Sequence, residues 1–286
     1  MFTLSPLHPT FDAALRDVTA RKPTMRAMAA SSLGTPPNER VVEAIEGLKR
    51  LSADTSAYVR EHAIVGFGRI GAEACVQPLI AAASDDDKRV RQAAIIALGR
   101  CPHEKAIVFV RGLLRDARAE MRMQATASLA EMDPEHACAD LIPMLADADP
   151  EVRAQAASCL GAIEATGAAD PLRKRLTDDD RTVRLEAALA LGKLKDRAAV
   201  DPLRRALEER DFGFAAAEAL GDCGTQDARE DLRRIAHRWL SPSLTRAAAA
   251  GALHRLGDPA GTALLRKMSR SLRKDVRAYA QSLLAS

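Results

Sequence analysis

The chain of 286 residues carries 42 Lys and Arg against 39 Asp and Glu, and its formal net charge of +3 is too small to argue by itself for nucleic-acid binding. Hydrophobic residues make up 47% of the chain and aromatic residues only 3%, which predicts an aliphatic core with few rings for stacking on nucleobases. No stretch approaches the ~20 apolar residues of a membrane span, and residues 1–10 lack the apolar region of a secretory signal. We therefore expect a cytoplasmic protein.

The first predicted element is a helix within residues 1–22. It covers Phe11 to Ala20, and its Leu15 lies where a second helix would precede the first copy of the repeat described next. We interpret residues 1–22 as an N-terminal cap and residues 23–286 as repeats.

A repeat with a period of about 31 residues follows this helix. Each copy has an Arg, an Ala three positions later and a large apolar residue seven positions later, usually followed by Gly. The copies begin at Arg26, Arg60, Arg91, Arg122, Arg153, Arg184, Gly213, Arg246 and Arg277. About nine copies of one unit predict an all-α fold, an α-solenoid.

The spacing within each copy predicts a helix, a turn and a second helix. In the copy at Arg60, for example, Val59, Ala63 and Phe67 are four positions apart and share one helical face. Small residues at the Ala position and six after the Arg allow a second helix to approach closely. The Gly that follows suits a helix end.

An Asp stands six positions before the Arg in the five central copies: Asp54, Asp85, Asp116, Asp147 and Asp178. Such a carboxylate can accept backbone N–H bonds or meet the Arg of an adjacent unit. The triplets Asp85–Asp87 and Asp178–Asp180 could be read as metal or acidic-partner sites. We prefer the interpretation that they begin helices, because helix N-termini attract acids.

The Asp, Val-Arg, Ala, Leu-Gly pattern resembles the short HEAT-like repeats of the phycobilisome-lyase type over roughly residues 20–286. The resemblance implies a right-handed superhelix of antiparallel helix pairs with the second helices on its concave side. Because each unit of a repeat array packs only on its neighbours, we expect a single elongated domain over residues 1–286. It implies less about function, because such solenoids include scaffolds, adaptors, chromophore-lyase subunits and nucleic-acid binders.

Two later departures from the repeat interrupt its regularity. The junction between Leu207 and Phe212 is shortened, and Gly213 replaces the Arg. The segment Trp239–Ser243 is lengthened and holds the only Trp of the chain. This segment is either a binding loop or a plug that repairs the stacking of the repeats, and the sequence favours the plug.

Pairs of basic residues recur on the predicted second helices of the C-terminal repeats, directly after a large apolar residue. We call them the basic ladder, and they are Arg173, Lys174, Arg204, Arg205, Arg233, Arg234, Arg266 and Lys267. They are candidates for binding a partner with an acidic surface. The alternative is a self-neutralised face, because Asp170, Asp201 and Glu230 precede Lys174, Arg205 and Arg234 by four positions. Only the last pair lacks such an acid, since Ala263 stands before Lys267.

The sequence contains none of the usual catalytic motifs and no pattern for a cofactor or metal. The neighbours His62 and Glu61 faintly resemble the His-Glu pairs of HEAT-like deoxyhypusine hydroxylases, but such pairs do not recur at equivalent repeat positions. The five cysteines lie in different repeats without a C-x-x-C, which predicts reduced core thiols.

We therefore predict a non-enzymatic protein-binding scaffold or adaptor that uses the concave face of the solenoid. Two alternatives stay open: a bilin-lyase subunit or chaperone-like factor for a chromophorylated protein, which the family resemblance implies, and a protein that contacts a nucleic-acid backbone. The scarcity of aromatic residues argues against the first, and the small net charge against the second. The oligomeric state is not predictable from these features.

Overall fold

The computed structural model describes residues 9–285, and within these residues it contains α-helices, short 3-10 helices and no strand. The α-helices of this part are α1 (Phe11–Asp17), α2 (Pro23–Leu33), α3 (Val41–Ser52), α4 (Ala57–Ile70), α5 (Val76–Ala82), α6 (Lys88–Gly99), α7 (Glu104–Leu113), α8 (Ala119–Met132), α9 (Ala137–Leu141), α10 (Pro150–Ala162), α11 (Ala169–Arg175), α12 (Arg181–Lys193), α13 (Val200–Ala206), α14 (Gly213–Cys223), α15 (Arg229–His237), α16 (Ser243–Arg255), α17 (Pro259–Met268) and α18 (Lys274–Ala285). The 3-10 helices are η1 (Asn38–Arg40), η2 (Glu73–Cys75), η3 (Ile142–Ala146), η4 (Thr166–Ala168), η5 (Arg197–Ala199) and η6 (Gln226–Ala228).

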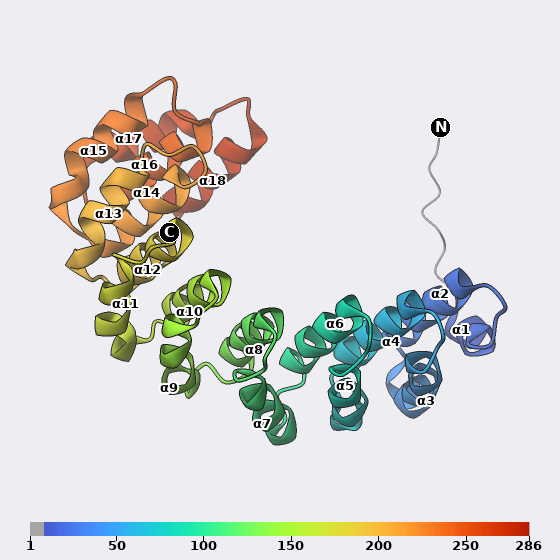
Figure 1. The fold of residues 1–286 in the computed structure, drawn as a ribbon. Helices are drawn as coiled ribbons and strands as arrows, with labels where there is room; N and C mark the ends of the chain where they lie inside the picture. The colour runs from blue at the N-terminus through green and yellow to red at the C-terminus, as the bar shows by residue number, and fades with distance from the viewer. Residues whose placement is uncertain (1–8, 286) are drawn as a thin grey trace. The chain divides into compact units, whose positions relative to one another are not determined.

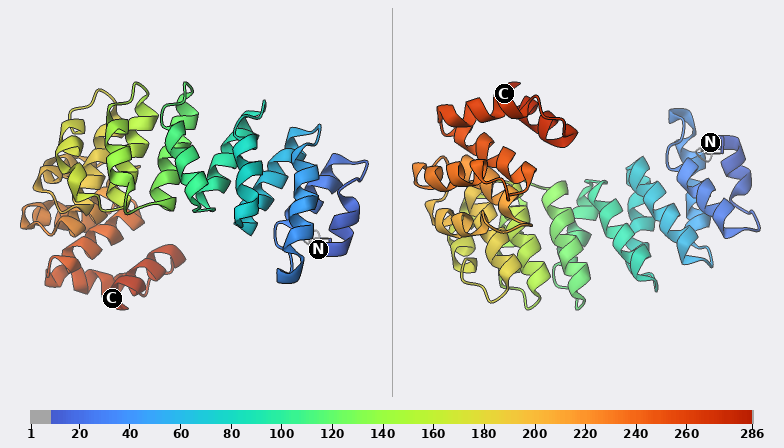
Figure 2. Two further views of the ribbon diagram at one scale, coloured as in Figure 1. Left: turned by 90° about the horizontal axis from the view of Figure 1, so that it is seen from below. Right: turned by 90° about the horizontal axis from the view of Figure 1, so that it is seen from above.

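The even-numbered helices from α2 to α18 carry the repeat motif and are the first helices of the repeats. The odd-numbered helices from α3 to α17 alternate with them along the chain and are the second helices (Figures 1 and 2). In α4 the predicted face of Val59, Ala63 and Phe67 is fully buried. The predicted unit of helix, turn and helix is confirmed, as is the all-α solenoid.

The chain divides into two compact units, residues 1–137 and residues 138–286. Each unit consists of helix pairs of the kind just described, and each is considered by itself below. The single domain over residues 1–286 and the right-handed superhelix stay predictions.

The N-terminal helix α1 packs on α2 and ends at Asp17, three residues before the end that the sequence predicts. Ala14 of this helix is fully buried. Arg40 contacts α1 twice: it forms an ion pair with Asp12, and its guanidinium carbon lies 4.4 Å from the centre of the Phe11 ring. The part of the predicted cap in residues 1–8 lies outside the described residues.

In several repeats the Arg ties two successive turns together. Arg60 donates from Nη1 to the backbone oxygen of Asp54 (2.9 Å), and from Nε and Nη2 to the two carboxylate oxygens of Asp85 (both 2.7 Å). Arg26 with Asp54, and Arg153 with Asp178, form the same bidentate pair. Charge-assisted forks of this kind are the stronger hydrogen bonds of proteins, so the repeated Arg and Asp serve as links between units.

The Asp residues also begin the helices, as predicted. Asp85 accepts the backbone N–H of Asp87, and Asp87 in turn accepts that of Arg89 at the start of α6. Asp178 and Asp180 do the same at α12. The acidic triplets are therefore parts of turns and caps.

Close packing explains why small residues recur in the first helices. A Cβ added to Gly161 on α10 would lie 2.6 Å from the Cα of Ala190 on α12, and one added to Gly68 on α4 would lie 2.7 Å from the Cβ of Ala97 on α6. Both contacts join successive first helices, which therefore approach each other nearly backbone to backbone.

Candidate partner-binding surface

The basic ladder occupies four successive second helices of the unit 138–286. Each pair follows a fully buried leucine, Leu172 on α11, Leu203 on α13, Leu232 on α15 or Leu265 on α17. Because the leucines point into the core, the two residues after each of them reach the surface. The predicted register of the second helices is confirmed.

The first Arg of the three N-terminal ladder pairs is held between two carboxylates. Arg173 binds Asp170 on its own helix and Asp196 at the start of the next second helix. Arg233 binds Glu230 and Asp258 in the same way, at 2.8 Å each. Asp258 is only 2% exposed in its side chain and also accepts the backbone N–H of Ala260 at the start of α17. These arginines therefore connect neighbouring second helices.

The predicted pairing four residues apart is wrong. Asp170, Asp201 and Glu230 bind Arg173, Arg204 and Arg233, three positions later, and not the residues that follow those arginines. The physical reason is that the first residue of each pair also lies beside an acid of the next repeat (Asp196, Asp231 or Asp258), so it gains two partners in one position. Arg234 takes Glu208 and Asp231 instead.

Four ladder residues have no ion-pair partner within residues 9–285: Lys174, Arg205, Arg266 and Lys267. All four side chains are exposed. The unpaired state of Arg266 and Lys267 agrees with the sequence, which places Ala263 at the acidic position. Four of the eight ladder residues thus pair with acids of the protein itself, and the other four are free to contact a partner.

The ladder lies on the outer row of helices within its unit, so its predicted concave position is wrong. In Figure 1 the first helices α12, α14, α16 and α18 lie on the inner side of the curve, and α11, α13, α15 and α17 lie on the outer side. The hydroxyl of Tyr279 on α18 reaches the carboxylate of Glu218 on α14, past the intervening α16. Side chains two repeats apart meet in this way only on the inner side of a bend.

A groove on this inner row was missed by the sequence analysis. It has a volume of about 320 Å³ and is lined by Leu189 and Phe214 among apolar residues and by Glu218 and Asp222 among acids. Burial raises the pKa of Asp222, although Arg255 lies 3.6 Å away. Two of the few aromatic rings, Phe214 and Tyr279, meet edge to face here, with centres 5.6 Å apart. The presence of these two aromatic residues on first helices, in a chain with few aromatic residues, is the sequence feature that could have pointed to this groove.

Trp239 does not plug the core. Its exposed fraction is 79%, and that of Leu240 beside it is 66%. The interpretation of this segment as a packing repair is therefore wrong. The segment runs over the surface between α15 and α16, and none of its residues is buried. It ends at Pro242, which directly precedes α16.

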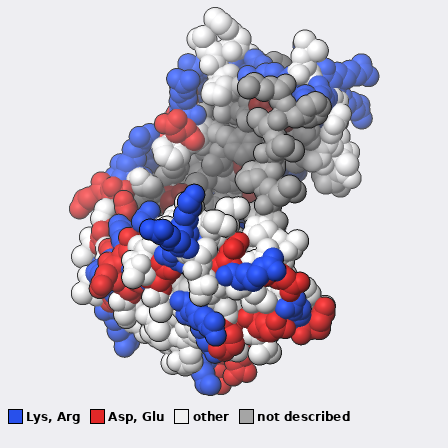
Figure 3. Space-filling view, turned by 90° about the vertical axis from the view of Figure 1, so that its right-hand side faces the viewer, with Lys and Arg blue, Asp and Glu red and all other residues white. Residues whose placement is uncertain are grey.

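In the described part of the chain no three His, Cys, Asp or Glu side chains converge as metal ligands. Cys75, Cys101 and Cys159 are buried, as predicted for core thiols, whereas Cys138 and Cys223 are partly exposed. Burial raises the pKa of Cys75 to about 11. Basic and acidic side chains lie beside one another on the face that Figure 3 shows.

Among the described helices, none has the length and apolar character needed to cross a membrane.

Comparison with known families identifies the class of protein that this architecture defines. The family model described as HEAT repeats matches residues 45–130 and 138–214, more than half of the chain. The chain therefore belongs to the HEAT-repeat family, and the predicted recognition is confirmed. No curated protein matches the sequence.

Solved structures show the same fold at low sequence identity. The Escherichia coli protein YibA is 19% identical, with a TM-score of 0.62 over 86% of this chain and 92% of its own. The Kap95 and Nup1 complex gives 14% identity and a TM-score of 0.69, covering 96% of this chain and 44% of that one. Importin beta gives 13% and 0.62, covering 96% and 46%. At these identities the similarity concerns the fold.

Proposed function

We propose that this protein is a non-enzymatic scaffold that binds another protein through the unpaired cations of the basic ladder. HEAT-repeat arrays present long rows of helices whose outward side chains vary while the packing positions stay fixed. The Kap95 structure, a complex with Nup1, is one case of this architecture holding another chain.

The observation that carries the proposal is the pair Arg266 and Lys267 on α17. Both side chains are exposed, and neither has an ion-pair partner within residues 9–285. Lys174 and Arg205 extend the same row on α11 and α13. Two adjacent cations without an internal acid attract an acidic surface, and the attraction is screened by salt.

The test is reversal of both charges. Arg266→Glu with Lys267→Glu should weaken capture of the native partner about tenfold or more and flatten the salt dependence of capture. Capture is measured by quantitative mass spectrometry of proteins retained from native lysate. Circular dichroism should be unchanged, because neither side chain is buried or paired.

The matched control reverses Lys88 and Arg89 at the start of α6, where Arg89 pairs with Asp87 at 3.3 Å. If the control reduces capture as much as the ladder variant, the ladder is not the binding surface. Retention on duplex DNA that falls steeply with salt would instead favour a nucleic-acid partner.

A further inference from the structure

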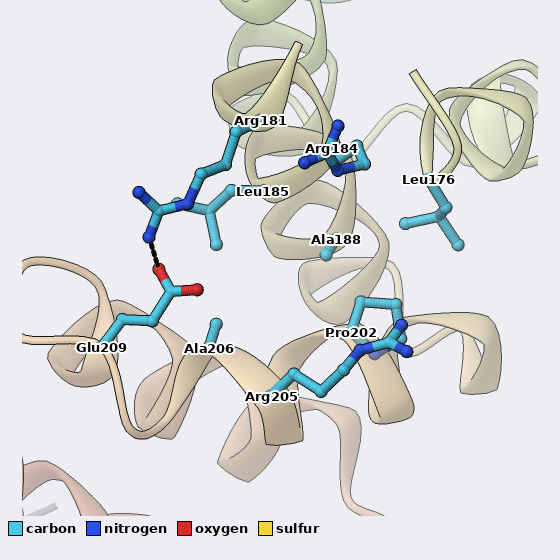
Figure 4. Close-up of a pocket in the computed structure, with 9 residues that line it drawn as sticks. All are labelled: Leu176, Arg181, Arg184, Leu185, Ala188, Pro202, Arg205, Ala206 and Glu209. Carbon is cyan, nitrogen blue, oxygen red and sulfur yellow. Dashed lines mark hydrogen bonds and ion pairs between the residues drawn. The ribbon is translucent and has the colours of Figure 1, made fainter. Parts of the chain in front are cut away.

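A pocket opens at the shortened junction, between α12 and α13 of the unit 138–286 (Figure 4). Its volume is about 390 Å³. The residues that line it are Leu176, Arg181, Arg184, Leu185, Ala188, Pro202, Arg205, Ala206 and Glu209. The repeating Arg–Asp link is interrupted at this place.

Arg184 is the repeat Arg of α12, and it keeps only half of the usual link. Its Nη1 donates to the backbone oxygens of Asp178 (2.7 Å) and Asp179 (2.9 Å), as Arg60 and Arg153 do in their own turns. In those repeats Nε and Nη2 bind an Asp 25 positions later. Within the described residues, no carboxylate binds Nε or Nη2 of Arg184.

The acid at the equivalent position is Glu209, and its carboxylate binds Arg181 instead (Figure 4). The guanidinium carbon of Arg181 also lies 5.4 Å from the centre of the Phe212 ring. Asp85 and Asp178 are held in place by a backbone N–H two residues on. The longer Glu209, drawn to Arg181, leaves the place beside Arg184 open.

The opposite wall of the pocket supplies a second guanidinium, Arg205, which is exposed and has no ion pair in the described chain. Buried Leu185, Ala188 and Ala206 form apolar walls between the two. Three Arg thus face one Glu. The Nε atoms of Arg91 and Arg246, which also lack a bidentate Asp, are buried, whereas Arg184 lines an open pocket.

We propose that this pocket binds the carboxylate of one Asp or Glu side chain of an acidic partner protein, in the place that an Asp of the chain itself fills in regular repeats. The inference rests on the proposed scaffold function and names a specific anchor for the partner. A guanidinium with free Nε and Nη2 donates two parallel hydrogen bonds to the oxygens of a carboxylate, and the apolar walls suit the methylene groups of a glutamate.

The experiment is calorimetric titration of the full chain with a hexaglutamate peptide at low salt. Arg205→Gln and Arg184→Lys should each weaken binding about tenfold. Arg184→Lys keeps the charge beside the turn carbonyls but removes the fork. Glu209→Gln should strengthen binding about threefold, because it releases Arg181. The control is Arg197→Gln, an exposed Arg on neighbouring η5 that pairs with Asp227 and should change nothing.

Unchanged affinity in both arginine variants would overturn the inference, as would absence of binding by the unmodified protein. Inorganic phosphate that displaces the peptide at a lower concentration than free glutamate would overturn the choice of a carboxylate. If hexaglutamate binding is lost only in the Arg266 and Lys267 variant, the proposal that the pocket binds a carboxylate is wrong, and the proposed function of the ladder stands. If capture of the native partner is insensitive to reversal of Arg266 and Lys267 while hexaglutamate binding still depends on Arg184 and Arg205, the proposed role of the ladder is wrong and the proposal for the pocket stands.

Discussion

At the scale of the residue, the stability of the array depends on buried Asp side chains that accept several hydrogen bonds. Asp178, with 4% of its side chain exposed, binds Arg153 and Arg175 and accepts the backbone N–H of Asp180. Replacing it would leave the guanidinium of Arg153, whose side chain is 14% exposed, without its acid.

Asp178→Ala should therefore lower the free energy of unfolding by about 2–4 kcal/mol, measured by urea denaturation. The control is Asp170→Ala, which removes an Asp that also pairs with an Arg but is 81% exposed. It should cost less than about 1 kcal/mol. Equal losses in the two variants would mean that the links between repeats contribute no more than surface pairs.

The same links predict a dependence on pH. Arg60 holds the pKa of Asp85 below its ordinary value of 3.8, and Arg26 does so for Asp54. A carboxyl group with a lowered pKa in the folded state stabilises the fold above its unfolded pKa, and this contribution is lost as the pH falls through the folded pKa. The free energy of unfolding should thus decrease as the pH is lowered from about 4.

Asp85→Asn checks the assignment. The variant should be less stable at pH 6 and should lose less stability than the unmodified protein between pH 4 and pH 2.5, in urea titrations at each pH. Identical slopes would show that other groups control the acid transition.

At the scale of the element, the spacing of the apolar residues allowed the helix pairs to be predicted from the sequence, and the small residues mark where successive first helices touch. Two glycines on helices test this packing in opposite directions. Gly161→Ala places a Cβ 2.6 Å from the Cα of Ala190, and the backbone of α12 cannot move aside as a flexible side chain could. Gly112 on α7 has no atom within 4 Å of the equivalent position.

Gly161→Ala should cost about 1–3 kcal/mol of stability through overpacking. Gly112→Ala should instead increase stability by about 0.5–1 kcal/mol, because Ala has the higher helix propensity. Thermal and urea unfolding measure both. A destabilising effect of the same size at both positions would mean that the first helices are not in the close contact described.

The ladder shows what the sequence left undetermined. Its helix and its exposed register followed from the buried leucines, but the pairing of Arg173 with Asp196 joins residues 23 positions apart, with all of α12 between them. Local spacing does not contain that contact. The sequence also could not predict which row of helices lies on the inner side of the bend, because curvature arises from small differences in packing that both helices of a repeat share.

At the scale of the whole molecule, the ends of the array need covering because each repeat packs only on its neighbours. A Cβ on Gly47 of α3 would lie 3.7 Å from Leu15 and 3.6 Å from Val18, so the residues of the first helix lie directly against the first repeat.

Deleting residues 1–22 should therefore expose an apolar surface and promote association, as measured by sedimentation velocity. Deleting residues 1–8 alone is the matched control, which separates the contribution of the helix from that of the segment before it. A monomeric product with an unaltered melting curve after the longer deletion would mean that Phe11–Asp17 is a dispensable tail.

The interrupted link at Arg184 has a consequence for how the chain opens. Local unfolding proceeds in cooperative segments, and their boundaries fall where neighbouring segments are least strongly coupled. Because the turn after α13 lacks the fork that joins Arg153 to Asp178 one repeat earlier, we expect such a boundary between α12 and α14. Amide protons of α14 onward would then exchange with solvent independently of those in α10 and α12. A partner that placed a carboxylate against Arg184 would merge the two segments into one cooperative unit and slow that exchange.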